Sequence, residues 1–193
     1  MPRCLCLVSL LASQKQGSYG KVKIHKEGTL AQLCHLDELF SALKLLYLSP
    51  LKSNIDDTFI KSTFGKEELS FCDEILVKVS RSFAAVIRQL PSVVLVDIMV
   101  FYLVLRALDT IEDDTSAFES HQAKIEQLIH FHERALQDPN WSLSGVGDGD
   151  ERRLLENFPM CHKVYAKLRP KSRDVIADIT KRMAAGMAEF VEK

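Results

Sequence analysis

Two aspartates, one helical turn apart, close the most apolar stretch of the chain. Residues 98–108 are apolar except for Arg106 and the hydroxyl group of Tyr102, and Asp109 and Asp113 follow directly. On a helix, all four of these polar residues fall on one narrow stripe. Two carboxylates at this spacing repel each other unless a cation lies between them. Mg²⁺ suits such a pair, because it prefers oxygen ligands and is usually held by one or two carboxylates together with substrate phosphates.

Two neighbours extend this pattern. Glu112 lies about 60–100° to one side of the stripe and is a third candidate ligand, whereas Asp114 faces away. Arg106 precedes Asp109 by almost one turn, and its forked guanidinium group suits phosphate oxygens. The alternative is an acidic helix end that is merely solvated. The apolar run and Arg106 favour a site for magnesium and phosphate.

Two motifs of the sequence resemble those of a known family. FYLVLRALDTIEDD at 101–114 and VSRSFAAVIRQL at 79–90 resemble the first aspartate-rich region of the squalene synthases, which join two farnesyl diphosphates head to head. The resemblance continues weakly at 138–141, clearly at 176–190 and faintly at 33–45. Phytoene synthases share the fold and the spaced aspartates, and they remain an alternative.

The resemblance implies an all-α isoprenoid (terpenoid) synthase fold, here incomplete. It implies catalytic roles for Asp109, Asp113 and Tyr102, and Mg²⁺ binding by the two aspartates with Glu112. The expected reaction couples two farnesyl diphosphates to presqualene diphosphate and then reduces it to squalene with NADPH. The expected location is the cytosolic face of the endoplasmic reticulum membrane, and the expected state is a monomer.

A second group of residues precedes the apolar stretch. If the helices on either side of Pro91 form a hairpin, residue 81 lies opposite about residue 101, so Arg81 and Arg106 could both reach a diphosphate. The resemblance places Ser80, Arg81, Ser82 and Phe83 along the farnesyl diphosphate site. The alternative is a surface arginine with solvated serines. Tyr102 has its own alternative, a core aromatic whose hydroxyl group finds a partner.

The chain ends at Lys193, whereas squalene synthases continue considerably further. By resemblance, we expect the second aspartate-rich helix, the region that contacts NADPH and the C-terminal membrane anchor to be absent. Little or no activity of this polypeptide alone is therefore expected. A non-catalytic helical fragment or truncated isoform is the competing hypothesis.

Composition excludes several other classes of protein. A net charge of −1 argues against a nucleic-acid-binding protein that relies on phosphate neutralisation. Five scattered cysteines form neither a disulfide framework nor a zinc motif. No uncharged apolar run is long enough to predict a transmembrane helix. His130 and His132 lie on nearly opposite sides of a helix and cannot bind one ion together.

Two further motifs are expected to carry no chemistry. Asp174 and Asp178 repeat the carboxylate spacing, but the basic residues around them predict ordinary exposed ion pairs. The glycine-rich stretch 145–150 is acidic and would repel phosphate.

Small residues at 184–186 predict either a wall of the prenyl tunnel, by resemblance, or close packing of helices.

Hydrophobic periodicity divides the chain into a poorly ordered leader, residues 1–29, and a helical domain, residues 30–193, the N-terminal part of a squalene/phytoene synthase domain. Loops are expected at 50–66 and 139–150. The predicted helices cover 30–48, 67–89, 92–113, 120–137, 151–168 with a break near Pro159, and 171–193. The 120–137 helix is expected to bury Ile125, Leu128, Ile129, His132 and Leu136. The last helix is expected to bury Val175, Ile176, Ile179, Met183, Met187 and Phe190.

Overall fold

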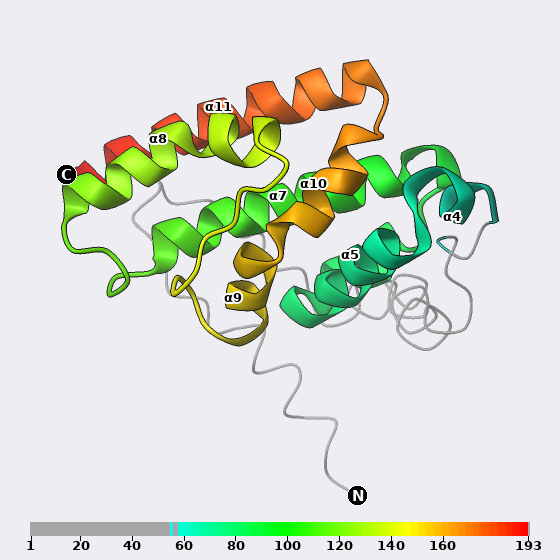
Figure 1. The fold of residues 1–193 in the computed structure, drawn as a ribbon, viewed down its shortest axis with the longest axis horizontal. Coiled ribbons are helices and arrows are strands. Elements are labelled where there is room, and N and C mark those ends of the chain that lie inside the picture. The colour runs from blue at the N-terminus through cyan, green and yellow to red at the C-terminus, as the bar shows by residue number, and fades with distance from the viewer. Residues whose placement is uncertain (1–54, 56–57, 193) are drawn as a thin grey trace, which may run out of the picture. The chain divides into compact units, whose positions relative to one another are not determined.

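A long apolar helix, α7 (Ser92–Asp113), runs through the middle of the described part of the chain (Figure 1). The computed structural model describes residues 55 and 58–192. Ten of the α7 side chains are buried, among them Leu103 and Leu108, which are fully inaccessible. The helix contacts α5, α6, α8, α9, α10 and α11. It therefore forms the axis of the core, as its nearly continuous apolar sequence predicts.

Within residues 55 and 58–192 there are eight α-helices and no strand, which confirms the all-α prediction. Besides α7, they are α4 (Thr58–Phe64), α5 (Lys66–Val79), α6 (Arg81–Ile87), α8 (His121–Gln137), α9 (Gly149–Glu156), α10 (Phe158–Ala166) and α11 (Pro170–Glu192). The expected leader and the expected helix 30–48 lie outside the described residues.

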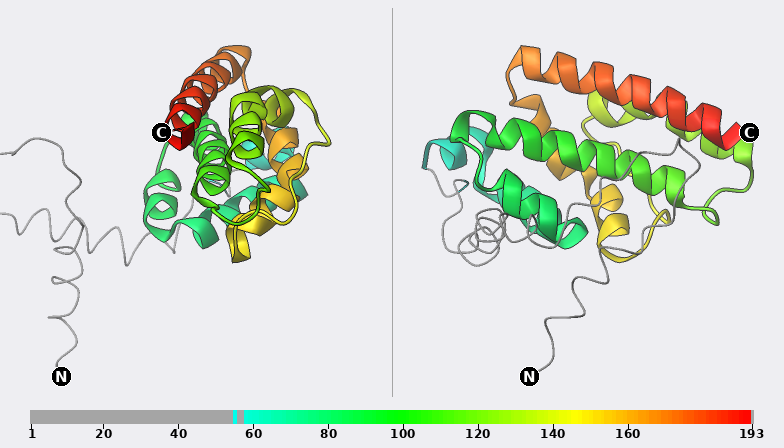
Figure 2. Two further views of the ribbon diagram at one scale, coloured as in Figure 1. Left: turned by 90° about the vertical axis from the view of Figure 1, so that its left-hand side faces the viewer. Right: turned by 180° about the vertical axis from the view of Figure 1, so that it is seen from behind.

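The helices pack on two sides of α7. On one side α8 and α11 lie against each other along most of their length, and both contact α7 (Figures 1 and 2). On the other side α5, α9 and α10 pack together and against α7. In the described part of the chain, no helix combines the length and apolar character needed to cross a membrane.

The predicted single helix 67–89 is wrong. The chain breaks at Ser80, whose backbone is extended, and α5 ends there while α6 begins. The Ser80 hydroxyl group accepts a hydrogen bond from the backbone N–H of Phe83 at 3.4 Å, so it caps α6. Serine competes with the helix for backbone donors, and this local cap explains the break. The expected loop 50–66 is also partly wrong, because α4 lies within it.

Other boundaries agree with the sequence. Ser120 caps α8 by accepting from the Ala123 N–H at 3.1 Å. The break predicted near Pro159 falls at Asn157, and Pro159 lies in the first turn of α10, where a proline needs no N–H donor.

The predicted buried faces of α8 and α11 are partly wrong. Leu128, Leu136 and Ile176 are buried as expected, but Ile129 is 45% exposed and Phe190 is 74% exposed. The face of α11 that is buried uses small side chains, namely Thr180, Ala184 and Ala188. Small residues allow two helix backbones to approach closely, so Ala184 serves helix packing, while Ala185 and Gly186 are exposed.

The two described cysteines, Cys72 and Cys161, are free thiols. They nevertheless lie together, with 3.7 Å between the Sγ atoms of Cys72 on α5 and Cys161 on α10. The hydrogen bond to Cys161 and burial raise the pKa of the Cys72 thiol. Both side chains therefore act as small buried apolar groups in the α5–α10 contact.

Candidate functional site at the acidic end of α7

The polar stripe of α7 forms a connected set of side chains. The Arg106 Nη2 donates to the Tyr102 hydroxyl oxygen at 3.3 Å, and its guanidinium carbon lies 5.9 Å from the centre of the Tyr102 ring. Phe83 of α6 packs against the same ring with 5.2 Å between centroids. Phe83, Tyr102 and Arg106, which were predicted site residues, are thus brought together by the packing of α6 on α7.

Asp109 and Asp113 follow on the same face and differ in their surroundings. Asp109 is half-buried, and burial raises the pKa of its carboxyl group. Arg106 opposes that rise, whereas the negative charges of Asp113 and Glu151 add to it. Asp113 is exposed and lines a cavity of about 580 Å³ between the end of α7, the start of α8 and the end of α11.

Glu112 lies at the edge of this cavity. Burial and the nearby Asp113 carboxyl group raise the pKa of Glu112. Its backbone carbonyl accepts a hydrogen bond from Nζ of Lys124, a buried lysine on α8. The sequence did not indicate a role for Lys124, because nothing in its position along α8 shows that it contacts the end of α7.

The acidic end of α7 offers oxygen donors of the kind that Mg²⁺ prefers. Burial raises the pKa of Asp109, and repulsion from Asp113 adds to the rise. No group of three or more His, Cys, Asp or Glu side chains in residues 58–192 is arranged to hold a metal by itself. A magnesium bound here would therefore need water or phosphate for its remaining ligands.

The structure does not place Arg81 or Ser82 in this set. Both side chains are exposed and make no hydrogen bond or ion pair with another described residue. The hairpin about Pro91 thus brings Phe83 to Tyr102, while Arg81 lies at the start of α6. The hydroxyl group of Ser80 caps α6, so this side chain has a structural role.

A further acidic residue, Glu151, was missed by the sequence reasoning. Its carboxylate lies on α9, and Oε1 is 3.5 Å from Nη1 of Arg106. The Arg106 Nε is buried and finds no acceptor among the described residues. Only folding brings position 151 next to position 106, and the sole sequence signal was the acidic first turn of α9.

The loop between α8 and α9 is fixed to the same end of α7. Asp114 accepts hydrogen bonds from the backbone N–H groups of Gly147 at 2.7 Å, Ser116 at 2.8 Å and Ala117 at 2.9 Å. These bonds, that from Gly147 above all, lower the pKa of Asp114 to about 2. Arg152 Nε donates to the Gly147 carbonyl at 2.8 Å. Asp114 faces away from the stripe, as predicted, and its task is to hold this loop.

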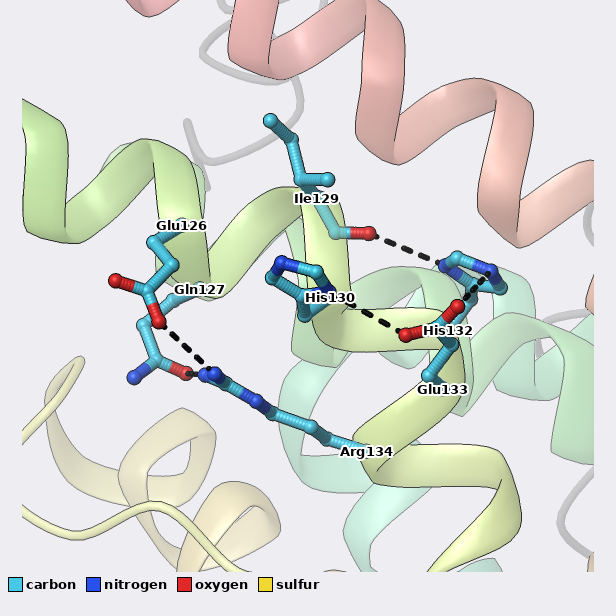
Figure 3. A network of polar contacts seen from close by, with 7 residues as sticks. All are labelled: Glu126, Gln127, Ile129, His130, His132, Glu133 and Arg134. Atoms are coloured by element: carbon cyan, nitrogen blue, oxygen red, sulfur yellow. Dashed lines mark hydrogen bonds and ion pairs between the residues drawn. The ribbon is translucent and has the colours of Figure 1, made fainter.

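His130 and His132 both approach the Glu133 carboxylate, at 3.3 and 3.8 Å, on the surface of α8 (Figure 3). Asp178 forms an exposed ion pair with Arg182 at 2.7 Å, one turn further along α11.

An apolar groove of about 420 Å³ opens between α7 and the first turns of α11. The apolar part of its wall consists of Val94, Ile98, Phe101, Val175 and Ile176. Ile98 lies on the face of α7 that carries Asp109, whereas Phe101 lies about 80° to its side. At 1.5 Å per residue, Phe101 is about 12 Å from Asp109 along the helix axis. The groove thus borders the polar stripe through Ile98.

Comparisons with known proteins show similarity over most of this chain. A family model described as squalene/phytoene synthase matches residues 76–193. Squalene synthase BSS of Botryococcus braunii is 43% identical over 157 residues, which are 81% of this chain and 32% of that protein. Inactive squalene synthase 2 of Arabidopsis thaliana is 41% identical over 162 residues, which are 83% of this chain and 36% of that protein.

A solved structure of TcSQS in complex with the ligand E5700 superposes with a TM-score of 0.63. It is 46% identical and covers 66% of this chain and 36% of its own. The chain therefore spans about a third of the length of the relatives that it matches. Taken with the all-α fold and the acidic end of α7, the match over residues 76–193 shows that the chain belongs to the squalene/phytoene synthase family.

Proposed function

We propose that this chain contributes the first diphosphate-binding half-site of a squalene synthase type prenyltransferase, which condenses two farnesyl diphosphates and forms squalene. The observation that carries the proposal is the grouping of Tyr102, Arg106, Asp109 and Asp113 on the face of α7 that also borders the apolar groove. The similarity to proteins named squalene synthase supports it and favours this activity over that of a phytoene synthase.

Asp109 and Asp113, with Glu112 beside them, would hold Mg²⁺. When bound, Mg²⁺ would neutralise charge on the diphosphate and so favour its departure. The work of the chain itself is to position these groups. Arg106 would donate hydrogen bonds to diphosphate oxygens, and Tyr102 holds the guanidinium group in place from one turn earlier.

The apolar groove would receive part of the prenyl chain. Ile98 lies on the face of α7 that carries Asp109, and Phe101 lies beside it in the groove, so the diphosphate and the chain of one substrate could bind along α7. Apolar walls exclude water, which would otherwise capture a carbocation. Phe83, which is 57% exposed beside Tyr102, would extend this apolar surface.

The glycine-rich turn formed by Gly145, Gly147 and Gly149 does not suit NADPH, because it carries Asp148 and Asp150, whose charges oppose a phosphate-rich cofactor. A location at the cytosolic face of the endoplasmic reticulum and a monomeric state are proposed on resemblance alone.

Titration calorimetry with farnesyl diphosphate, with and without Mg²⁺, tests the proposal. The wild-type chain is expected to bind the diphosphate only when Mg²⁺ is present, and Asp109→Asn and Asp113→Asn are expected to reduce the affinity by at least about tenfold, since each removes a charged ligand. Asp178→Asn is the matched control, because it changes an aspartate at the same helical spacing in an exposed ion pair. Equal binding by all four proteins would refute the proposal.

A second candidate is a non-catalytic member of the family. The similarity to the Arabidopsis thaliana protein named inactive squalene synthase 2 favours it. Incubation with farnesyl diphosphate, Mg²⁺ and NADPH, followed by product analysis, tests it. Formation of presqualene diphosphate or squalene would refute the second candidate.

A further inference from the structure

Glu151 lies beside the guanidinium group of Arg106. It belongs to α9, so it approaches the α7 stripe from a separate element. Its Oε1 lies 3.5 Å from Nη1 of Arg106, and both side chains are partly exposed, at 39% and 27%. An ion pair of this kind is weak, because water screens it and its separation exceeds that of a good hydrogen bond.

The hydrogen bonding of the Arg106 guanidinium group is incomplete. Nη2 donates to Tyr102, Nη1 faces Glu151, and Nε has no acceptor among the described residues. A guanidinium group carries five N–H donors and binds oxyanions best in pairs. The side chain is therefore anchored on one side by Tyr102 and held only loosely on the other by Glu151.

The charges around Arg106 are strongly unbalanced. Asp109, Asp113 and Glu151 all act on the same region of α7, against the single positive charge of Arg106. Magnesium at the two aspartates would offset their charge, but Glu151 would still face an incoming diphosphate. An anion that binds Arg106 must therefore compete with Glu151 or displace it.

We propose that Glu151 is an internal counter-ion of Arg106 that keeps the guanidinium group in position before the diphosphate binds and yields its place to the diphosphate. This inference rests on the proposed function of Arg106. Glu151 is thus a positioning residue: it acts through Arg106, and it lowers the affinity of the site for anions.

Calorimetry with inorganic pyrophosphate in the presence of Mg²⁺, on the full chain, tests this role. Glu151→Gln keeps the size and a hydrogen-bonding group but removes the charge. It is expected to raise pyrophosphate affinity by about three- to fivefold, the range of a partly exposed ion pair. Glu156→Gln, on an exposed position of the same helix, is the matched control and is expected to change affinity less than about twofold. An unchanged or weaker affinity in Glu151→Gln overturns the inference.

A double-mutant cycle identifies the route of the effect. In an Arg106→Gln background, Glu151→Gln is expected to change affinity by less than about twofold, because the competition for the guanidinium group is gone. A full gain in that background overturns the inference, since Glu151 would then act by long-range electrostatic repulsion of the anion and not through Arg106. Titration with Mg²⁺ alone excludes a metal-ligand role: a marked loss of Mg²⁺ affinity in Glu151→Gln would show that Glu151 binds the metal and would also overturn it.

The outcomes separate this inference from the proposed function. If the wild-type chain shows no Mg²⁺-dependent pyrophosphate binding, the proposed function fails and the inference fails with it. If the wild type binds and Asp109→Asn does not, but Glu151→Gln brings no gain, only the inference fails. Circular dichroism spectra of each variant establish that the helices are retained.

Discussion

At the level of single residues, Asp109 has the most informative environment. Its carboxyl group is half-buried, and burial raises its pKa above the usual value. The nearby Asp113 and Glu151 raise it further, and Arg106 only partly compensates. A carboxylate that is positioned to bind a cation is expected to lower the stability of the protein when no cation is bound. The charge of Asp109 therefore lowers the stability of the metal-free protein.

The sign of the pH dependence follows from the direction of the shift. Because the folded-state pKa of Asp109 is above its unfolded-state pKa, the folded protein binds protons more readily. The destabilisation is fully present above the folded-state pKa, is relieved as the pH falls through it, and is absent below the unfolded-state pKa. Loss of the charge should matter at neutral pH and should not matter in acid.

Asp109→Asn is expected to raise the thermal unfolding midpoint of the metal-free protein at pH 7. The gain should shrink as the pH falls through the raised pKa of Asp109 and should disappear below the unfolded-state pKa. The same variant should lose the stabilisation that Mg²⁺ gives the wild type. Thermal unfolding followed by circular dichroism measures both effects. A lower midpoint in Asp109→Asn at pH 7, with the Mg²⁺ effect intact, would contradict this account.

At the level of elements, the loop between α8 and α9 is fixed to the end of α7 by close contact. Gly147 has a φ of 72°, and a Cβ atom placed there would lie 2.4 Å from Cγ2 of Thr110 on α7. Gly145 has a similar φ of 78°, but a Cβ there would meet no atom within 4 Å. Both positions require a left-handed backbone, but only position 147 lies against α7.

Gly147→Ala is accordingly expected to destabilise the protein more than Gly145→Ala. The left-handed backbone costs each variant about 1–2 kcal/mol, and the clash with Thr110 adds about 1–3 kcal/mol at position 147. Urea unfolding monitored by circular dichroism gives both values. Equal losses in the two variants would mean that the loop moves away from α7 at little cost.

The contact between α8 and α11 depends on small side chains. Ala184 is fully buried on α11, and the neighbouring Ala185 is exposed. Ala184→Leu should force the helices apart and lower the free energy of unfolding by about 1–3 kcal/mol. Ala185→Leu should change it by less than about 0.5 kcal/mol. The same urea experiment measures both, and a tolerated leucine at 184 would argue against close packing.

At the level of the whole molecule, α7 connects the two sides of the core. Leu103, near its middle, is fully inaccessible, whereas the nearby Leu105 is partly exposed. Since α7 contacts both the α8–α11 pair and the α5–α9–α10 group, a cavity in α7 should weaken both sides together.

Leu103→Ala is expected to cost about 2–5 kcal/mol, and Leu105→Ala clearly less. Native-state hydrogen exchange should show that protection falls by a similar amount in α5 and in α11. If only one of these helices lost protection, the two sides of α7 would be separate cooperative units.

The sequence alone predicted the elements with strong periodicity and the polar stripe of α7. Its apolar run could be satisfied only by a buried helix, and the spacing of Tyr102, Arg106, Asp109 and Asp113 placed them on one face because a helix has a fixed period. The motifs at 79–90 and 101–114 were sufficient to indicate the family, and the comparisons confirmed it. Periodicity predicted one continuous helix across Ser80, where a serine cap instead ends α5 and begins α6. It also predicted the wrong buried residues on α11, where small side chains rather than large ones form the contact.

Tertiary structure decided which distant residues meet. Glu151 reaches Arg106, Lys124 reaches the end of α7, and Asp114 holds Gly147, although nothing in the spacing of these positions relates them. It also placed Arg81 at the start of α6 with an exposed side chain. Periodicity within one helix is a local property of the backbone, whereas contacts between helices depend on packing all the side chains at once.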